Sequence, residues 1–266
     1  MRALLLGGNG MLGPWAVKAL AGRHELRVTD ISEPPKNFKH EYRKLDVSNL
    51  DAVVRAAEGM DCIVNLSVLR HDRKLAWDVS TRGNYNMMVA AVKHSIRRVI
   101  NTGPHFQLAG PQYEAWDFGL HPDMPPQPGT RLYALSKAMG QEVCRVFAER
   151  HDIHVMTLLY YNMKLPGTLA GPETRTGMAV TYHNDMTPFS LAWTDCGEAI
   201  RCAVEVELSR LPSRCETFFT FSDIPHDKFR NDKIQRILGF RPRYHLEALW
   251  NKELSQNPSP SGRGSG

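Results

Sequence analysis

Tyr133 and Lys137 lie four residues apart and have the side-chain types and spacing for acid–base chemistry. Apolar residues at helical spacing predict a helix over residues 131–150, and a four-residue separation puts both side chains on one face of that helix. A nearby lysine cation favours the phenolate form of a tyrosine. We therefore expect Tyr133 to be able to accept a proton near neutral pH as a general base, and to donate one in the reverse direction.

The same spacing recurs at Tyr160 and Lys164, so the spacing alone is not specific. Tyr160 ends a run that predicts a strand over residues 153–160, and Lys164 lies two residues before Pro166, where the chain is expected to be extended. An extended chain would hold the two side chains roughly 13 Å apart. The pair at 133 and 137 is therefore the one that a helix supports.

A glycine-rich turn near the amino terminus predicts a site for a dinucleotide. It follows an apolar strand over residues 1–6 and precedes a helix over residues 11–21. Glycines at such a junction let the backbone approach phosphate oxygens, and the first amides of the helix favour negative charge. The glycines fit two spacings, Gly8-x-Gly10-x-x-Gly13 and Gly7-x-x-Gly10-x-x-Gly13. Both spacings predict that the turn binds a pyrophosphate.

Asp30 ends the next predicted strand, residues 25–30, about 20 residues beyond the glycines. A carboxylate at this separation accepts hydrogen bonds from the adenosine ribose. A 2′-phosphate in the same place would be repelled by the like charge. A strand-end aspartate can also do no more than cap a turn. Taken with the glycines, Asp30 predicts NAD as the cofactor.

Short apolar strands alternate with helices through the first 160 residues. The predicted strands cover residues 1–6, 25–30, 42–45, 61–65, 98–101 and 153–160, and the longer helices cover 50–57, 74–94 and 131–150. Strands joined by helices imply right-handed crossovers and parallel pairing. We therefore predict an α/β fold with a doubly wound parallel sheet.

We expect residues 1–254 to form a single domain. Irregular segments after the sixth strand predict a small carboxyl-side substrate lobe, formed mainly by residues 162–192 and 222–254. Ligands of open α/β sheets bind at the carboxyl ends of the strands, where this lobe would lie. Residues 255–266 have no apolar side chains to bury and are predicted to be a flexible tail.

The composition argues against several functional classes. The 33 basic and 28 acidic residues give a net charge of only +5, without a block of like charges, so nucleic-acid binding is not expected. No apolar run approaches the roughly 18 residues of a membrane-spanning helix. The five cysteines form no C-x-x-C pair and are expected to be reduced, which together with the absence of a secretory pattern predicts a cytoplasmic protein. His151 and His154 lack an acidic or thiol partner nearby, so no metal is expected.

Together these motifs resemble the extended short-chain dehydrogenase/reductase family, or NAD-dependent epimerase/dehydratase family, over nearly all of residues 1–250. The Tyr-x-x-x-Lys pair, the stretch 80–86 and the ending 237–242 carry the likeness, and the short chain looks most similar to uronate dehydrogenases. The resemblance implies a Rossmann fold, a homodimer, a carbohydrate-like substrate, and a Lys137 that also holds the nicotinamide ribose. It implies cofactor contacts at Gly7, Asn9, Gly10, Met11, Leu12, Gly13, Asp30, Asp46, Val47, Leu66, Ser67, Tyr133 and Lys137.

The chain departs from the family pattern where polar side chains are expected beside the tyrosine. The family places a catalytic serine or threonine just after the fifth strand, but this chain reads Asn101-Thr102-Gly103-Pro104-His105. Thr102 or His105 could stand in as the hydrogen-bond partner of the substrate. Nearby, Asn65-Leu66-Ser67 replaces the family's usual Asn-x-Ala.

Two further residues are candidates for substrate contact. After the sixth strand, uronate dehydrogenases have an arginine that fits a carboxylate, whereas this chain has Tyr160-Tyr161-Asn162. Asn162 matches the asparagine that contacts the substrate in epimerases. Arg70 lies near the expected nicotinamide end, where it could meet an anionic substrate group or be an ordinary exposed charge.

Two functions remain open at this point. The first is an NAD-dependent oxidoreductase or epimerase acting on a secondary hydroxyl of a sugar, sugar acid or similar polyol, with Tyr133 as the base and Lys137 beside it. The alternative is an NAD-binding protein of the same fold that has lost catalysis and serves as a sensor or partner. Gly103 and Pro104, which stand where a hydroxyl is expected, keep this alternative open.

Overall fold

A seven-stranded sheet is the framework of the fold, with the strand order β3-β2-β1-β4-β5-β6-β9. The computed structural model describes residues 1–69, 72–110, 119–165, 190–222 and 229–244, and every neighbouring pair in this sheet is parallel. The strands are β1 (Arg2–Leu6), β2 (Glu25–Asp30), β3 (Glu41–Lys44), β4 (Cys62–Asn65), β5 (Arg98–Pro104), β6 (His154–Tyr160) and β9 (Cys215–Thr220). The strand order reverses between β1 and β4, which is where doubly wound sheets bind their ligands.

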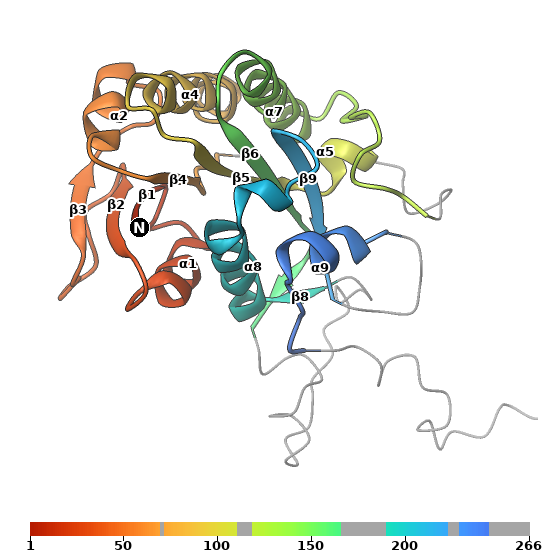
Figure 1. Cartoon of the computed structure of the whole chain (residues 1–266). Coiled ribbons are helices and arrows are strands. Elements are labelled where there is room, and N and C mark those ends of the chain that lie inside the picture. Colours follow the sequence, from red (N-terminus) through yellow and green to blue (C-terminus); the bar gives the residue numbers. More distant parts are fainter. Residues whose placement is uncertain (70–71, 111–118, 166–189, 223–228, 245–266) are drawn as a thin grey trace, which may run out of the picture.

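Helices cover both faces of this sheet (Figure 1). One face carries α2 (Leu50–Ala57), α4 (Gly83–Lys93) and α7 (Leu132–Arg150), and the other carries α1 (Gly13–Leu20), α8 (Trp193–Glu205) and α9 (Asp232–Leu238). Strand side chains alternate between the faces, so each face has its own apolar core. In β5, Val99 packs in the core under α7, whereas Ile100 packs in the core under α8. The predicted doubly wound α/β fold is confirmed.

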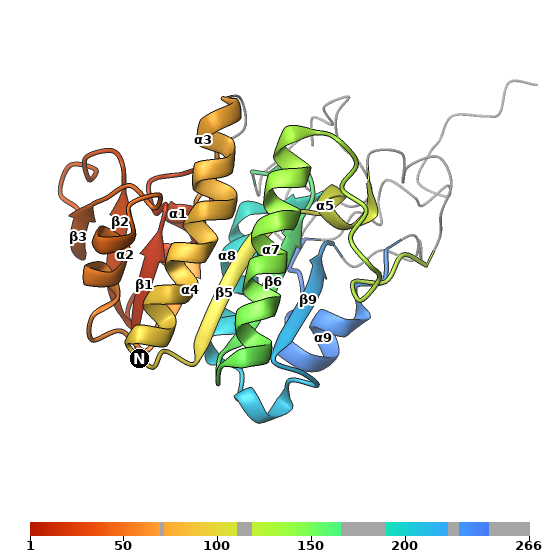
Figure 2. The ribbon, with the colours of Figure 1, turned by 90° about the horizontal axis from the view of Figure 1, so that it is seen from above.

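The helix predicted over 74–94 is present but is not uniform. It consists of α3 (Arg73–Trp77), the π-helix η1 (Asp78–Arg82) and α4 in direct succession. Figure 2 shows α4 and α7 side by side across the sheet. A Cβ at Gly140 of α7 would lie 2.1 Å from the carbonyl oxygen of Ser80, so the π-turn and α7 pack with their backbones in close approach.

Two strands differ from the prediction because their extent depends on pairing. β5 continues three residues beyond the predicted end, since it pairs with β6 as far as Pro104 opposite Tyr160. The prediction stopped at six strands, but β9 adds a seventh by pairing with β6 along its length. Both corrections concern the part of the sheet below α7, where the candidate catalytic residues lie.

Of the predicted substrate lobe, the structure describes only part. Residues Met163–Lys164 (β7) and Leu191–Ala192 (β8) form a small parallel pair, and α9 follows β9 in sequence. Short elements complete the described chain, namely α5 (Phe106–Ala109) and the 3-10 helix η4 (Leu208–Arg210). The rest of the lobe and the predicted tail, 255–266, lie outside the described residues, so the proposed division of the chain stays a prediction.

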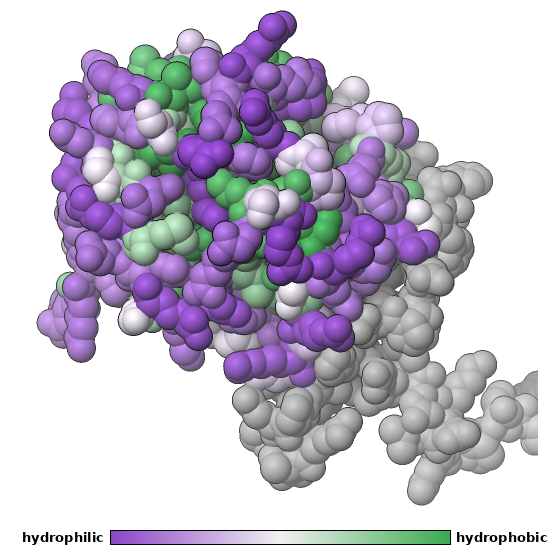
Figure 3. All heavy atoms as spheres, viewed as in Figure 1, coloured by the Kyte–Doolittle hydropathy of each residue, from purple (hydrophilic) through white to green (hydrophobic). Residues whose placement is uncertain are grey.

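The surface is mostly hydrophilic on the face drawn in Figure 3, with hydrophobic residues in small patches between hydrophilic ones. Within the described ranges, no helix has the length and apolar character needed to cross a membrane.

Candidate active site

The glycines of the turn between β1 and α1 have different structural roles. Gly7 has a φ of +78°, and a Cβ there would lie 2.7 Å from the Cα of Ser67. A Cβ at Gly13 would lie 1.9 Å from the carbonyl oxygen of Gly8, so only glycine lets α1 begin this close to the turn. Among the described residues, the one atom close to a Cβ at Gly10 would be the Gly7 oxygen, at 3.2 Å. The fold itself requires glycine at 7 and 13, while position 10 faces an open side.

The backbone of this turn has the donors that a pyrophosphate needs. The amides of Gly7 and Gly8 both donate to the Thr29 oxygen, at 2.9 and 2.8 Å. The amides of Met11 and Leu12, by contrast, donate no hydrogen bond within the described residues. Unpaired amides at the start of a helix bind anions, because their partial charges and the helix dipole act together. The turn therefore fits the predicted phosphate group.

Asp30 is held beside the turn at the end of β2. Its Oδ2 accepts a hydrogen bond from the Asn9 amide at 3.0 Å, and its Oδ1 accepts from the amide and hydroxyl of Ser32, at 3.2 and 3.1 Å. The Asn9 side chain donates to the Tyr42 hydroxyl at 2.9 Å. Burial, and then the charge of Asp30, raises the pKa of Tyr42, which therefore stays neutral. Asp30 thus caps a local turn and also lies where the adenosine ribose was predicted.

Asp46 and Val47 follow β3 and have different exposures. Asp46 is exposed, and its Oδ1 accepts from the Ser48 amide at 2.8 Å. Val47 is buried in the core with α2 and α4, and its carbonyl accepts from the Asn86 side chain at 2.8 Å. Asp46 is therefore the accessible member of this pair.

Leu66 and Ser67 follow β4 and bring their main chain between the turn and α7. The Leu66 amide donates to the Leu6 oxygen at 2.8 Å. The Ser67 oxygen accepts from Nζ of Lys137 at 2.8 Å, and the Ser67 hydroxyl is buried with no hydrogen-bond partner among the described residues. The glycine turn and α7, the helix with Tyr133 and Lys137, are therefore connected through one peptide segment.

Lys137 is buried, with 2% of its surface exposed, and its ammonium is held by main-chain oxygens. Nζ donates to Ser67 O at 2.8 Å and to Thr102 O at 3.1 Å, which satisfies a charge that would be costly to bury alone. Tyr133 lies one helical turn earlier, half-buried, with its ring edge-on to Phe106 at 5.7 Å between centroids. The predicted pair therefore lies at the carboxyl ends of β4 and β5, close to the glycine turn.

Thr102 lies inside β5 rather than after it. Its Oγ1 donates to the Asn65 oxygen at 2.8 Å, so its hydroxyl is bound within the sheet. Because strand side chains alternate, Thr102 shares the α8 face with Ile100, and position 103 shares the α7 face with Val99. Thr102 contacts Lys137 through its main-chain oxygen.

His105 is 2% exposed and packs among aromatic rings at the ends of β5 and β6. Its ring lies edge-on to Tyr161 at 4.2 Å and to Phe106 at 5.2 Å between centroids. Burial lowers the pKa of His105 to about 3, against the opposite effect of a hydrogen bond with the Tyr160 backbone, so the ring is neutral at pH 7.

Asn162, the other candidate on this side, has a φ of +42° and donates from Nδ2 to the Ser190 hydroxyl at 2.9 Å. This bond connects the end of β6 to the segment that leads into β8. Arg70 lies outside the described residues, so its predicted substrate contact stays a prediction.

Sequence reasoning missed a chain of polar side chains beside α7. Gln107 of α5 donates to Gln141 of α7, and Gln141 donates to the Thr217 hydroxyl of β9 at 2.8 Å. Gln141 lies four residues after Lys137, so the helical spacing of Tyr133, Lys137 and Gln141 was the one signal that could have revealed it.

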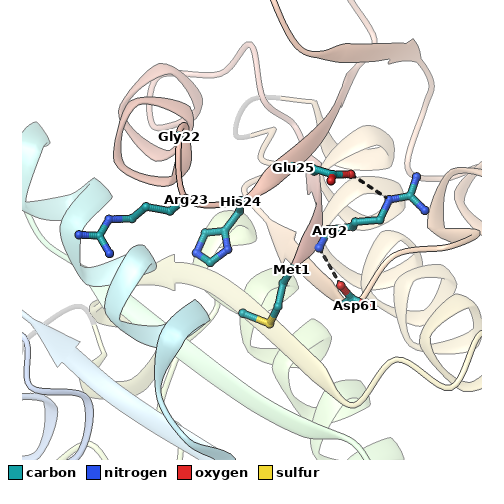
Figure 4. Close-up of a pocket in the computed structure, with 7 residues that line it drawn as sticks. All are labelled: Met1, Arg2, Gly22, Arg23, His24, Glu25 and Asp61. Carbon is teal, nitrogen blue, oxygen red and sulfur yellow. Dashed lines mark hydrogen bonds and ion pairs between the residues drawn. The ribbon is translucent and has the colours of Figure 1, made fainter.

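A pocket of about 460 Å³ lies at the opposite edge of the sheet (Figure 4), near the starts of β1, β2 and β4. Two of its cations are already paired, Arg2 with Glu25 at 3.5 Å and Arg23 with Glu205 at 3.4 Å. The part of the chain that the structure describes contains no group of side chains suited to a metal ion. The full lining of the pocket is Met1, Arg2, Gly22, Arg23, His24, Glu25 and Asp61. Tyr133 and Lys137 lie instead at the carboxyl edge of the sheet, where open α/β sheets bind their ligands.

Comparison with known proteins agrees with this fold. Residues 3–190 match the model of the NAD dependent epimerase/dehydratase family. The chain is 27% identical to L-arabinose 1-dehydrogenase (NAD(P)(+)) of Haloferax volcanii over 258 residues, 91% of this chain and 96% of that protein. It is 26% identical to a uronate dehydrogenase of Pseudomonas syringae pv. tomato, over 67% of this chain and 63% of that protein.

The structure is similar to that of uronate dehydrogenase from Agrobacterium tumefaciens, with a TM-score of 0.72 and 20% identity over 98% of this chain and 91% of that chain. The family model covers well over half of the chain. The predicted resemblance, the Rossmann fold and the class of NAD-dependent dehydrogenases and epimerases are confirmed. This chain belongs to the NAD-dependent epimerase/dehydratase family.

Proposed function

We propose that this protein is an NAD-dependent oxidoreductase that acts on a secondary hydroxyl of a sugar or sugar acid. The observation that carries the proposal is the position of Tyr133 and Lys137. The buried Lys137 ammonium is bound to Ser67, whose Cα lies against Gly7 of the phosphate-binding turn. A proton-accepting tyrosine and a dinucleotide turn therefore share one edge of the sheet.

The residues around the turn fit the parts of the cofactor in order along that edge. The amides of Met11 and Leu12 would bind the pyrophosphate, with Gly10 allowing its approach, and Asp30 would accept from the adenosine ribose. Asp46 and Val47 would flank the adenine, and Leu66 and Ser67 would lie along the nicotinamide half, as the family resemblance implies. Bound NAD supplies the hydride acceptor.

The chain's own groups would handle the proton and the substrate oxygen. Tyr133 would take the hydroxyl proton as the alcohol becomes a carbonyl, and would return it in the reverse direction. The Lys137 cation favours the phenolate form of Tyr133 and would also hold the nicotinamide ribose. Thr102 supports Lys137 through its main-chain oxygen, at 3.1 Å.

The relatives point to carbohydrate-like substrates. Two of them are named L-arabinose 1-dehydrogenase and uronate dehydrogenase, and a third is named NAD-dependent glucose-6-phosphate dehydrogenase. At the end of β6 this chain has Asn162 in place of the arginine expected for a carboxylate, which favours a neutral sugar over a hexuronate. Asn162, His105 and Arg70 remain the proposed substrate contacts.

The decisive experiment follows reduced nicotinamide by absorbance while NAD is offered with L-arabinose, glucose 6-phosphate, glucuronate and galacturonate. Tyr133→Phe should lower turnover by about 100-fold or more and keep NAD binding. Tyr160→Phe is the matched control, because its hydroxyl donates to Cys196 O at 3.2 Å, within the core, and should keep turnover. Tight NAD binding without turnover of any sugar would instead support the non-catalytic sensor or partner.

We also propose a homodimer formed through the α4 and α7 face. Large apolar side chains are exposed on α4 and α7, at Tyr85 (48%), Met139 (40%) and Val146 (45%), and at the end of the preceding α3, at Trp77 (37%). Contiguous exposed apolar surface is typical of protein interfaces, and a second copy would cover it.

The five cysteines are all free thiols, which supports the proposed cytoplasmic location.

A further inference from the structure

Position 103 faces the catalytic helix but has no side chain. Val99 and Asn101 share its face of β5, with Val99 packed in the core of α7 and Asn101 hydrogen-bonded to Asn65, whose amide also donates to Asn84 of α4. The neighbouring Thr102 oxygen accepts from Lys137. A side chain at 103 would therefore project beside Lys137, where a catalytic hydroxyl is expected, yet the residue is glycine.

The side chain of Gln107 takes the space that a residue at 103 would occupy. A Cβ on Gly103 would lie 1.9 Å from Oε1 of Gln107 and 2.7 Å from its Cδ. Gln107 is 1% exposed, and its Oε1 is buried without accepting a hydrogen bond from any described residue. A buried amide group without a partner is costly, and which end of a carboxamide carries the oxygen follows from its hydrogen bonds, so the end of Gln107 beside Gly103 calls for a ligand.

The carboxamide is held by the chain of side chains that runs to β9. Its Nε2 donates to Gln141, and Gln141 donates to the Thr217 hydroxyl at 2.8 Å. A hydroxyl both donates and accepts, so the same chain can run in the opposite direction from Thr217. In that direction the Thr217 hydroxyl donates to Gln141, and Gln141 donates to the Gln107 oxygen. The N–H groups of Gln107 then face Gly103, where a serine or threonine would place its hydroxyl.

The same short helix also touches the proposed base. Phe106, next to Gln107 in α5, packs against the Tyr133 ring at 5.7 Å between centroids. Tyr133, Lys137 and Gln141 lie on one face of α7 at four-residue spacing, and α5 packs on this helix. Gln107 therefore reaches the catalytic face of α7 from the side of β5.

We propose that the Gln107 carboxamide is the hydrogen-bond partner of the reacting substrate oxygen, in the place of the missing hydroxyl. This inference rests on the proposed function. Gln107 forms no covalent bond: it donates to the substrate oxygen while Tyr133 takes the hydroxyl proton and the hydride passes to NAD. Gly103 is then the residue that makes room for Gln107, and Thr217 orients the carboxamide through Gln141.

The test replaces the Gln107 carboxamide by a serine hydroxyl at position 103 within the same protein. Gln107→Ala should lower kcat about 100-fold, as the loss of one donor to a reacting oxygen does, with NAD binding kept. Gly103→Ser alone should lower the unfolding temperature of the protein without NAD, because its Cβ meets Gln107. The double variant Gly103→Ser/Gln107→Ala should regain that temperature and recover at least about tenfold of the lost kcat. Thr217→Val should lower kcat, and Thr217→Ser should restore it.

Three results would overturn the inference. One is a Gln107→Ala enzyme with the kcat of the wild type. Another is a double variant that regains thermal stability but no kcat, which would make Gln107 a packing residue only. The third is a Gly103→Ser protein as stable as the wild type. A wild type that turns over no sugar refutes the proposed function itself, whereas an active wild type with an undiminished Gln107→Ala refutes this inference alone.

Discussion

Replacing Gly10 or Gly13 by alanine should separate cofactor binding from folding. Both glycines belong to one turn, and each substitution adds one methyl group. At Gly13 the new Cβ would lie 1.9, 2.4 and 2.8 Å from three backbone atoms of Gly8. At Gly10 it would have a single neighbour, the Gly7 oxygen at 3.2 Å, and Gly10 has no positive φ that an alanine would strain.

The expected magnitudes follow from these contacts. Gly13→Ala overpacks a rigid backbone and should lower the free energy of unfolding by about 1–3 kcal/mol. Gly10→Ala should leave the free energy of unfolding within about 1 kcal/mol of the wild type, because the entropy lost by the unfolded chain offsets a mild contact. Its methyl group, however, would keep the pyrophosphate from the Met11 and Leu12 amides. Losing a hydrogen bond to a charged group costs about 1.5–3 kcal/mol, or roughly 10- to 100-fold in NAD affinity.

The assay combines urea unfolding without cofactor and calorimetric titration with NAD on both variants. Gly13→Ala should lower the free energy of unfolding in urea, whereas Gly10→Ala should lower the affinity for NAD measured by calorimetry. Gly239→Ala is a useful control, since it has a positive φ but no atom within 4 Å of its Cβ, and should not change NAD affinity. A Gly10→Ala protein that binds NAD as the wild type does would refute the placement of the pyrophosphate.

Three further outcomes are expected. Asp30→Ser should narrow the preference for NAD over NADP by about 1 kcal/mol, roughly fivefold, measured by titrating both cofactors, because it removes a charge that repels the 2′-phosphate. The pKa of His105 is about 3 in the folded protein and about 6.5 in an unfolded chain, so the unfolded chain binds more protons between these values. The free energy of unfolding should therefore fall by about 1.4 kcal/mol per pH unit below 6.5, and His105→Leu should flatten that dependence in urea unfolding between pH 6.5 and 4.5. An equal slope in both proteins would contradict it. Val146→Glu should give a monomeric mass in solution scattering where the wild type gives a dimer, and a monomeric wild type would refute the proposed interface.

The boundaries of a helix or strand could be predicted from the sequence where a residue at its end, such as a helix-capping asparagine, stops the element. The boundaries of α2 were predicted correctly because Asn49 caps the helix, its side chain accepting from the Ala52 amide at 3.0 Å. β2 was likewise bounded by Asp30 at its end. In contrast, β9 and the last residues of β5 depend on pairing with β6, which no local pattern reveals.

The same division holds in the site. The placement of Tyr133 and Lys137 on one face of α7 could be predicted, because a helix brings residues four apart together whatever surrounds it. The face on which Thr102 lies follows from strand alternation, but only once β5 is known to continue to Pro104. Gln107 was missed because its contact with Gly103 arises where α5 folds back onto the strand, and its partners come from α7 and β9.

The way in which Lys137 is held has a consequence for how such an enzyme can change. Its ammonium is bound by the main-chain oxygens of Ser67 and Thr102, and every amino acid offers that oxygen. Side chains at both positions are therefore open to replacement without loss of the lysine's partners, and Ser67 and the 102–105 segment are where the sequence is predicted to depart from the family pattern. Substitutions that change the substrate side of the site can therefore accumulate while the Lys137 ammonium keeps its position.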